Sequence, residues 1–207
     1  TPGRLLDLIE HESSFGAAGH IVAKLNSLTD PEMVDALCRA SQAGVRVDLL
    51  IRGICCLRPG VEGLSENIRV RSILGRYLEH SRVVRFEHGG GDSPLFLIGS
   101  ADWMGRNLTR RVETLVEATN PTVKAQIVNQ IMAANLADEA QSWVLGPDGR
   151  YLRDLPEDRA LFNCHRFFMN NPSLSGRGSA GAKDVARLVG EARSETGANK
   201  AAELAAE

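Results

Sequence analysis

Histidine and arginine side chains that could handle phosphate are concentrated in one part of the sequence. His80 is followed two positions later by Arg82, within the segment GRYLEHSRVVRFEH. An imidazole can give or take a proton near neutral pH, or attack phosphorus. A guanidinium can neutralise non-bridging phosphate oxygens as their charge redistributes. Because an H-x-R pair is common by chance, its context must decide between a phosphoryl-transfer site and a structural histidine.

The segment around His80 is rich in arginine. From Arg46 to Arg85 there are eight arginines, no lysine and four acidic residues, in a chain whose formal net charge is -2. Arginine binds oxyanions through a planar fork, so this bias favours phosphate recognition over general solubility. Arg76 belongs to the same basic segment. A solvated basic face with acidic neighbours in space is the alternative.

Arg52 ends an apolar run, VDLLIR, and Gly53 follows it. In parallel α/β sheets the carboxyl ends of the strands form the ligand crevice. A charged side chain at that point is either functional or extends past the end of the strand into solvent. The basic loop beyond it favours function, so Arg52 is a candidate phosphate ligand.

Alternating helices and strands must bring these residues together. The pattern predicts a helix at 2–16, strands at 20–26 and 45–52, and between them a helix that Asp30 caps and Gly44 ends. A strand, a helix and a strand with short connections predict a right-handed parallel crossover. The first half of the chain therefore indicates an α/β fold.

Further strands and one long helix are expected in the second half. They are, in order, a half-exposed strand at 68–74, a hairpin around GGGDSP, a strand at 110–118, a helix over 120–144 and a short strand after PDGR. Beyond these the sequence becomes small and polar. We therefore expect a mixed β-sheet flanked by helices in a domain of residues 1–153, and a poorly ordered, partly helical tail at 154–207.

Composition argues against several classes of protein. Aromatic residues make up 5% of the chain, too few for a stacking platform, and the net charge argues against nucleic-acid binding. Four cysteines without a C-x-x-C pair predict buried, reduced thiols in a cytoplasmic protein. No apolar run has transmembrane length and no signal peptide precedes the first helix, which leaves peripheral contact with the inner membrane open. The missing initiator Met suggests a fragment.

The spacing around His80 resembles the signature of the phospholipase D superfamily, H-x-K-x4-D followed by G-S-x-N. Here Arg82 replaces the lysine, Glu87 the aspartate and Asp102 the asparagine. Two longer segments are more specific: LLIRGICCLRPGVEGLSENIRVRSILGRYLEHSRV and IGSADWMGRNLTRRVE. They closely resemble the C-terminal domain of bacterial polyphosphate kinases of the long, multidomain type, and the resemblance runs from about His20 to Arg153.

The resemblance implies a phospholipase D-like fold and reversible transfer of the terminal phosphate of ATP to polyphosphate, with Mg2+. The phosphohistidine of that family lies on the first of two phospholipase D-like domains, and no segment here matches its H-x-K motif. His80, within YLEHSR, matches the family's other essential histidine, and Arg52, within IRG, matches an arginine that contacts nucleotide phosphates. Arg76, Arg82 and Asp102 are further candidates for substrate contact.

The implied partners are ATP or ADP, polyphosphate, the preceding domains and further copies of the chain as a homo-oligomer. No metal ligands are expected in this chain, because no cluster has the spacing for a tightly held ion, so Mg2+ should arrive with ATP. Asp102 could equally cap a helix or pair with Arg106 or Arg110, and Trp103 is expected in the core.

Two other functions remain open. One is a phosphodiesterase that builds a hydrolytic site from two phospholipase D-like halves, although three substitutions in the single motif count against it. The other is a phosphate-binding module that does not turn over when isolated. The phosphotransferase hypothesis depends on one spatial expectation, which is that Arg52 and His80 converge on a shared anion-binding hollow.

Overall fold

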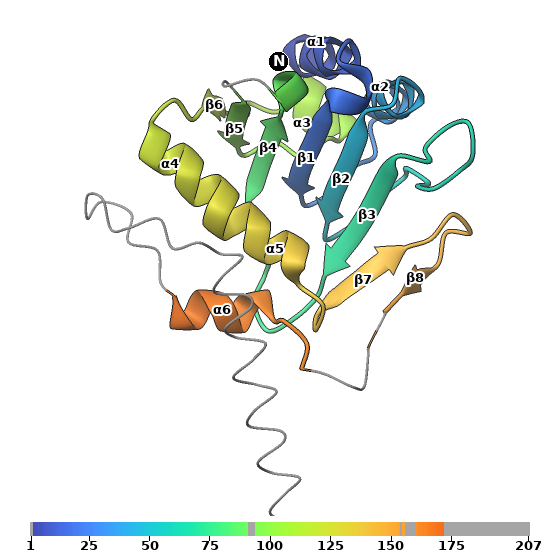
Figure 1. Cartoon of the computed structure of the whole chain (residues 1–207). Helices are drawn as coiled ribbons and strands as arrows, with labels where there is room; N and C mark the ends of the chain where they lie inside the picture. Colours follow the sequence, from blue (N-terminus) through green and yellow to red (C-terminus); the bar gives the residue numbers. More distant parts are fainter. Residues whose placement is uncertain (1, 91–93, 154, 156–159, 172–207) are drawn as a thin grey trace, which may run out of the picture. The chain divides into compact units, whose positions relative to one another are not determined.

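The computed structural model describes residues 2–90, 94–153, 155 and 160–171 of the 207-residue chain (Figure 1). Contacts divide the chain into two compact units. The first comprises residues 1–74, 78–118 and 143–152, and the second comprises 75–77, 119–142 and 153–207. The expected domain boundary after residue 153 stays a prediction, and most of the expected tail, from residue 172 on, lies outside the described residues.

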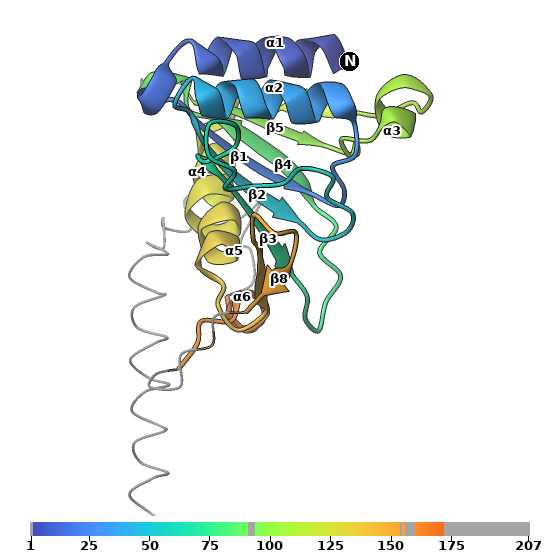
Figure 2. The same ribbon diagram turned by 90° about the vertical axis from the view of Figure 1, so that its right-hand side faces the viewer.

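The first unit contains two long helices that pack against each other, α1 (Pro2–Ser13) and α2 (Pro31–Gln42). They lie side by side along the sheet (Figure 2). The Asp30 side chain accepts a hydrogen bond from the Met33 backbone N–H at 3.2 Å, and proline occupies the first helical position, as predicted. Gly44 follows the helix with a φ of 97°, which favours glycine.

Within the described residues the sheet has eight strands, in the order β6-β5-β4-β1-β2-β3-β7-β8. Their bounds are His20–Leu25 (β1), Arg46–Ile51 (β2), Ile68–Ile73 (β3), Arg82–Phe86 (β4), Leu95–Gly99 (β5), Leu115–Glu117 (β6), Ser142–Leu145 (β7) and Tyr151–Leu152 (β8). Strands β1, β2 and β3 pair in parallel, whereas β4, β5 and β6 continue from β1 in antiparallel order, and β7 pairs antiparallel with β8. The mixed sheet, the parallel crossover and the hairpin are thereby confirmed.

This topology brings four chain segments to one end of the sheet, where β1 and β2 finish. We call it the site end of the sheet. Strand β4 begins there and β5 finishes there, because each runs antiparallel to its neighbour. The register pairs Leu25 with Ile51, Lys24 with Val83, and Arg82 with Gly99. Residues that follow β1, β2 and β5, or that precede β4, therefore meet at this end.

Three short elements complete the first unit: η1 (Gly16–Ala18), η2 (His88–Gly90) and α3 (Gly105–Thr109). Trp103, just before α3, is 1% exposed and belongs to the core, as expected. Among the described residues no disulfide involves any of the four cysteines, but the expectation of burial holds only for Cys164, and Cys56 is exposed. In the part of the chain that the structure describes, no helix combines the length and apolar character needed to cross a bilayer.

In the second unit, the prediction of one continuous helix is wrong. Instead of one helix over 120–144, α4 (Pro121–Gln126), a π-helical segment η3 (Ile127–Met132) and α5 (Ala133–Ala137) end at Asp138. Asp138 is extended, with ψ of 130°, and its carboxylate accepts hydrogen bonds from the backbone N–H groups of Gln141 at 2.8 Å and Cys164 at 2.7 Å. The second of these donors begins helix α6 (Cys164–Asn170), 26 residues away.

Candidate functional site

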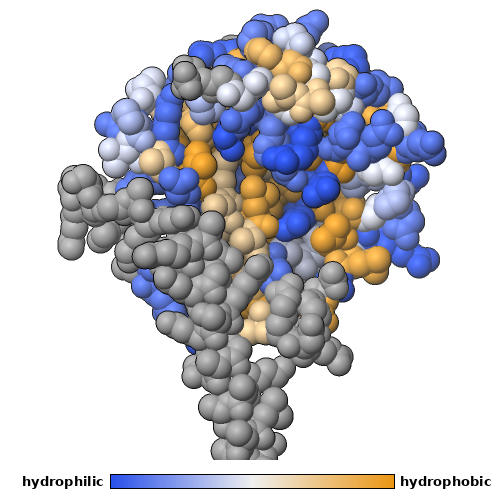
Figure 3. Space-filling view, viewed as in Figure 1, coloured by the Kyte–Doolittle hydropathy of each residue, from blue (hydrophilic) through white to orange (hydrophobic). Residues whose placement is uncertain are grey.

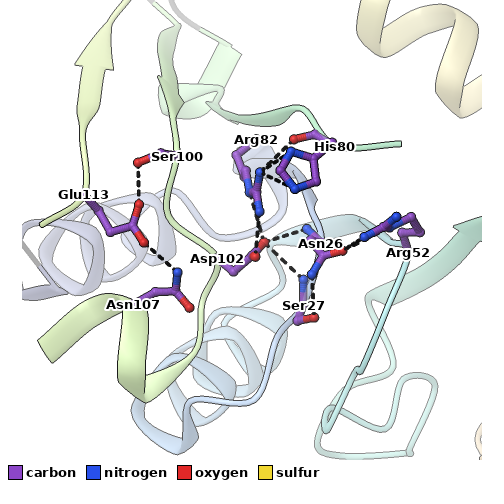
Figure 4. A network of polar contacts seen from close by, with 9 residues as sticks. All are labelled: Asn26, Ser27, Arg52, His80, Arg82, Ser100, Asp102, Asn107 and Glu113. Atoms are coloured by element: carbon purple, nitrogen blue, oxygen red, sulfur yellow. Dashed lines mark hydrogen bonds and ion pairs between the residues drawn. The ribbon is translucent and has the colours of Figure 1, made fainter. Parts of the chain in front are cut away.

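Five polar residues form a continuous series of contacts at the site end of the sheet, in which Asn26 takes part through both its backbone N–H and its side chain (Figure 4). They come from the loops after β1, β2 and β5 and from the start of β4. In order of contact they are Arg52, Asn26, Asp102, Arg82 and His80. The series includes both residues expected to act on phosphate, and it links them through groups from three other segments.

Asp102 forms the centre of this series. Asp102 is only 4% exposed. Arg82 donates to both oxygens of its carboxylate, from Nε to Oδ1 at 3.2 Å and from Nη2 to Oδ2 at 2.9 Å. Oδ1 also accepts from the backbone N–H groups of Asn26 at 2.7 Å and Ser27 at 3.2 Å. The expected pairing with Arg106 or Arg110 is wrong, because the ion-pair partner of Asp102 is Arg82.

His80 is exposed and sits against the Arg82 guanidinium. Arg82 Nη1 lies 2.8 Å from His80 Nδ1 and donates to the His80 carbonyl oxygen at 2.9 Å. His80 precedes β4, so His80 and Arg82 do not meet as neighbours on one face of a strand. The same Nη1 lies 3.3 Å from His80 Nε2, so the shorter contact, to Nδ1, is taken to set the tautomer of the ring. Because a guanidinium has no acceptor, Nδ1 must accept and Nε2 must carry the proton of the neutral ring.

Arg52 is half-buried just beyond the end of β2. Its Nε donates to Asn26 Oδ1 at 2.9 Å, and its Nη2 contacts the same oxygen. With Lys24 and Glu79, Arg52 lines a small hollow at this end of the sheet. Glu79 is the neighbour of His80 in sequence, and its carboxylate pairs with Lys24 at 2.5 Å. Arg52 and His80 therefore lie at the same end of the first unit, but His80 is not among the residues that line this hollow, and a shared anion-binding hollow stays a prediction.

Two other residues from the sequence analysis lie elsewhere. Glu87, which occupies the acidic position of the motif, donates its backbone N–H to the His20 carbonyl at 3.1 Å, at the opposite end of β1 from Asn26. Its carboxylate pairs with Arg85. Arg76 belongs to the second unit, where its guanidinium lies 5.7 Å from the centre of the Tyr77 ring. A role for Arg76 in substrate contact stays a prediction.

A second polar group near the site was not anticipated from the sequence. Glu113 accepts a hydrogen bond from Asn107 Nδ2 at 2.6 Å and another from the Ser100 hydroxyl (Figure 4). These two hydrogen bonds lower the pKa of Glu113. The Gly-Ser pair of the motif pointed to Ser100, but nothing in the local pattern distinguished Glu113 from other exposed acidic residues.

The carboxylates of this region are already occupied. Both oxygens of Asp102 accept from Arg82 or from backbone N–H groups, and both oxygens of Glu113 accept from side chains. Glu79 pairs with Lys24. Mg2+ requires near-octahedral oxygen ligands and binds through carboxylates that face it. This donor set does not fit an Mg2+ ion held by the chain itself.

Acid should weaken the contribution of Asp102 to stability. Burial raises the pKa of its carboxyl, but the hydrogen bonds and charge of Arg82, together with the backbone N–H groups, leave that pKa below its ordinary value. Since the folded-state pKa lies below the unfolded one, the stabilisation is complete above about pH 5 and is lost as the pH falls below about 4. We expect Asp102→Asn to lower the free energy of unfolding by about 3 kcal/mol near neutral pH.

Urea unfolding of the two proteins at several pH values measures this effect. The difference in free energy of unfolding between wild type and Asp102→Asn should shrink as the pH is lowered below about 4, because the carboxyl of the unfolded chain then takes up a proton more readily than the carboxyl of the folded protein does. A difference that stays constant over that range would mean that the charge of Asp102 contributes nothing to stability.

Comparison with known proteins gives a consistent result. Residues 3–164 match the family described as "Polyphosphate kinase C-terminal domain 2". The chain is 55% identical over 168 residues to the polyphosphate kinase of Erythrobacter litoralis and 53% identical over 156 residues to that of Synechocystis, covering 80% and 74% of this chain. It spans 23% and 21% of those two relatives.

Solved structures agree with this family. The crystal structure of polyphosphate kinase from Porphyromonas gingivalis matches with a TM-score of 0.75 and 35% identity, over 81% of this chain and 26% of that one. Nuc, a phospholipase D family member from Salmonella typhimurium, matches with a TM-score of 0.46 and 20% identity, over 73% of this chain and 91% of that one. Nothing further follows from a likeness as low as the second. With a family match over most of its length and close relatives of one name, this chain belongs to the polyphosphate kinase family.

Proposed function

We propose that this chain is the C-terminal catalytic domain of a longer polyphosphate kinase, which reversibly transfers the terminal phosphate of ATP to a polyphosphate chain. The observation that carries the proposal is the series of contacts from Arg52 to His80 at one end of the sheet. It offers a guanidinium and an imidazole to one ligand, from segments that are far apart in the sequence.

Phosphoryl transfer needs little covalent chemistry from the protein, and mainly needs positioning and positive charge around the equatorial oxygens. Arg52 would hold phosphate oxygens through its N–H groups that do not face Asn26. His80 would donate a hydrogen bond from Nε2 to the phosphoryl group or the leaving oxygen, since in this tautomer Nε2 has no lone pair with which to attack. The bond from the terminal phosphorus to the bridging oxygen breaks, and its electron pair leaves with ADP.

The acceptor of the phosphoryl group would be a histidine of a preceding domain, whose imidazole nitrogen forms a bond to the phosphorus as the bond to ADP breaks. The resulting phosphohistidine would later pass the group to polyphosphate. Mg2+ would reach the site bound to the phosphates of ATP, where it offsets their charge. We further propose that ATP or ADP and polyphosphate are the ligands and that the preceding domains are partners. The enzyme would form a homo-oligomer and would be cytoplasmic. Arg82 and Asp102 would act at this site by holding the other groups in position.

A binding experiment on the 207-residue chain tests the proposal. We expect calorimetry to detect binding of Mg-ATP and of polyphosphate, and we expect no release of nitrophenol from bis(p-nitrophenyl) phosphate. Arg52→Ala should weaken the binding of both ligands. Hydrolysis of the diester would favour a phosphodiesterase, and absence of binding to either ligand by the wild-type chain would overturn the proposal.

A further inference from the structure

The carboxylate of Asp102 contacts both sides of the site and accepts four hydrogen bonds from within the protein. Oδ1 accepts from Arg82 Nε and from two backbone N–H groups, and Oδ2 accepts from Arg82 Nη2. An anion that presented a free oxygen to phosphate would repel it. We propose that Asp102 and Asn26 are positioning residues that together set the spacing between the Arg52 guanidinium and the His80 imidazole. This inference rests on the proposed phosphotransferase function.

One arm of the arrangement runs from Asp102 to the imidazole. The Arg82 side chain is 13% exposed, and its bidentate ion pair with Asp102 holds the guanidinium in one orientation. In that orientation Nη1 donates to His80 Nδ1 at 2.8 Å and to the His80 carbonyl at 2.9 Å, so both ring and backbone are fixed. Nε2–H is then the group left to face a ligand. Arg82 is thereby used for positioning, with its charge balanced by Asp102.

The other arm runs from Asp102 to the guanidinium of Arg52. The carboxylate holds the backbone N–H groups of Asn26 and Ser27, which fixes the loop after β1. The Asn26 side chain then accepts from Arg52 through Oδ1 and donates through Nδ2 to the Ser27 hydroxyl at 3.1 Å. Because both ends of the amide are engaged, its orientation is determined, and Arg52 meets the oxygen.

The loop after β1 is tightly enclosed, so a displacement of Asp102 would be transmitted to Asn26. The Gly53 N–H donates to the Asn26 carbonyl at 2.7 Å, and the Trp103 N–H donates to the Ser27 carbonyl at 3.1 Å. A Cβ atom on Gly53 would lie 2.9 Å from the Asn26 carbonyl oxygen, closer than real Cβ contacts allow. The loops that carry Arg52 and Asp102 are therefore packed against opposite sides of Asn26 and Ser27. Positioning of this kind matters because small displacements of reacting groups cost large factors in rate.

The test uses Asp102→Asn and Asn26→Ala in the 207-residue chain, with two measurements. The first is the 15N NMR spectrum of the His80 ring, which reports which nitrogen carries the proton and needs no ligand. The second is the dissociation constant for Mg-ATP. We expect Asp102→Asn to change the ring from the single Nε2–H form to a mixture and to weaken ATP binding about tenfold or more.

Asn26→Ala separates the two arms, because it leaves the ion pair between Asp102 and Arg82 intact. We expect it to weaken ATP binding about tenfold while the His80 ring keeps its Nε2–H form. It also provides a second variant should Asp102→Asn fail to fold. Glu12→Gln is the matched control: Glu12 is also buried and accepts from the backbone N–H groups of His20 and His88, but it lies on α1 and not at the site end of the sheet.

The outcomes distinguish this inference from the proposed function. If the wild-type chain binds ATP, but Asp102→Asn and Asn26→Ala bind it equally well, the positioning roles are wrong and the function stands. If the wild-type chain binds no ATP, the proposed function fails, and the His80 spectrum of Asp102→Asn still decides the first arm. A change of the same size in Glu12→Gln would reveal a general loss of structure and overturn the positioning roles.

Discussion

Replacing His80 by alanine in the longer polyphosphate kinase proposed above is expected to lower kcat for polyphosphate synthesis by about 10²–10⁴-fold, the usual contribution of a positioned acid or base. The KM for ATP should change little, because Arg52 still binds phosphate. The exposed position of His80 means that truncation removes no core packing, so the fold should be retained. Initial rates at saturating ATP, with a circular dichroism spectrum of each protein, measure both effects.

His11→Gln is a suitable control for this substitution. His11 is also exposed, and its ring contacts Phe15 and His88, so it takes no part in the series of contacts from Arg52 to His80. We expect that variant to retain the wild-type kcat. Near-wild-type turnover in His80→Ala would remove His80 from the mechanism, whatever the family likeness.

Arg52→Ala should lower kcat/KM for ATP by about 10²–10⁴-fold. The physical reason is the loss of two charge-assisted hydrogen bonds to phosphate, each of about 1.5–3 kcal/mol. Arg52→Lys should recover only part of this loss, because an ammonium restores the charge but cannot contact Asn26 Oδ1 and phosphate with the geometry of a planar fork. Steady-state kinetics with ATP as the varied substrate give both ratios.

Arg69→Ala is the matched control for Arg52→Ala. Arg69 is an exposed arginine on β3, and it pairs in register with Asp48, near the start of β2 and thus away from the site end. The Arg69→Ala substitution should leave kcat/KM for ATP close to the wild-type value. Equal losses in the two variants would mean that the general positive charge of this region, and no specific contact of Arg52, drives ATP binding.

Local sequence patterns were sufficient for most of the elements that carry the site. Asp30 and Gly44 bound the helix between β1 and β2 through backbone contacts within a few residues. The alternation of strand and helix then required parallel strands whose ends meet, which predicted that Arg52 lies beside the residues that follow β1. The helix expected over 120–144 failed because Asp138 binds a backbone N–H group 26 residues away, beyond the reach of any local pattern.

The sequence by itself determined which residue types could handle phosphate, and on which strands and loops they lie. Only the tertiary structure decided their partners. Asp102 had several arginines within a few residues, yet it pairs with Arg82 and binds the Asn26 backbone across 76 positions of sequence. A buried carboxylate takes whichever donors the packed loops bring to it, because leaving it unpaired in the interior would cost several kcal/mol. That choice follows from how β1, β4 and β5 pair, and spacing along the chain does not encode it.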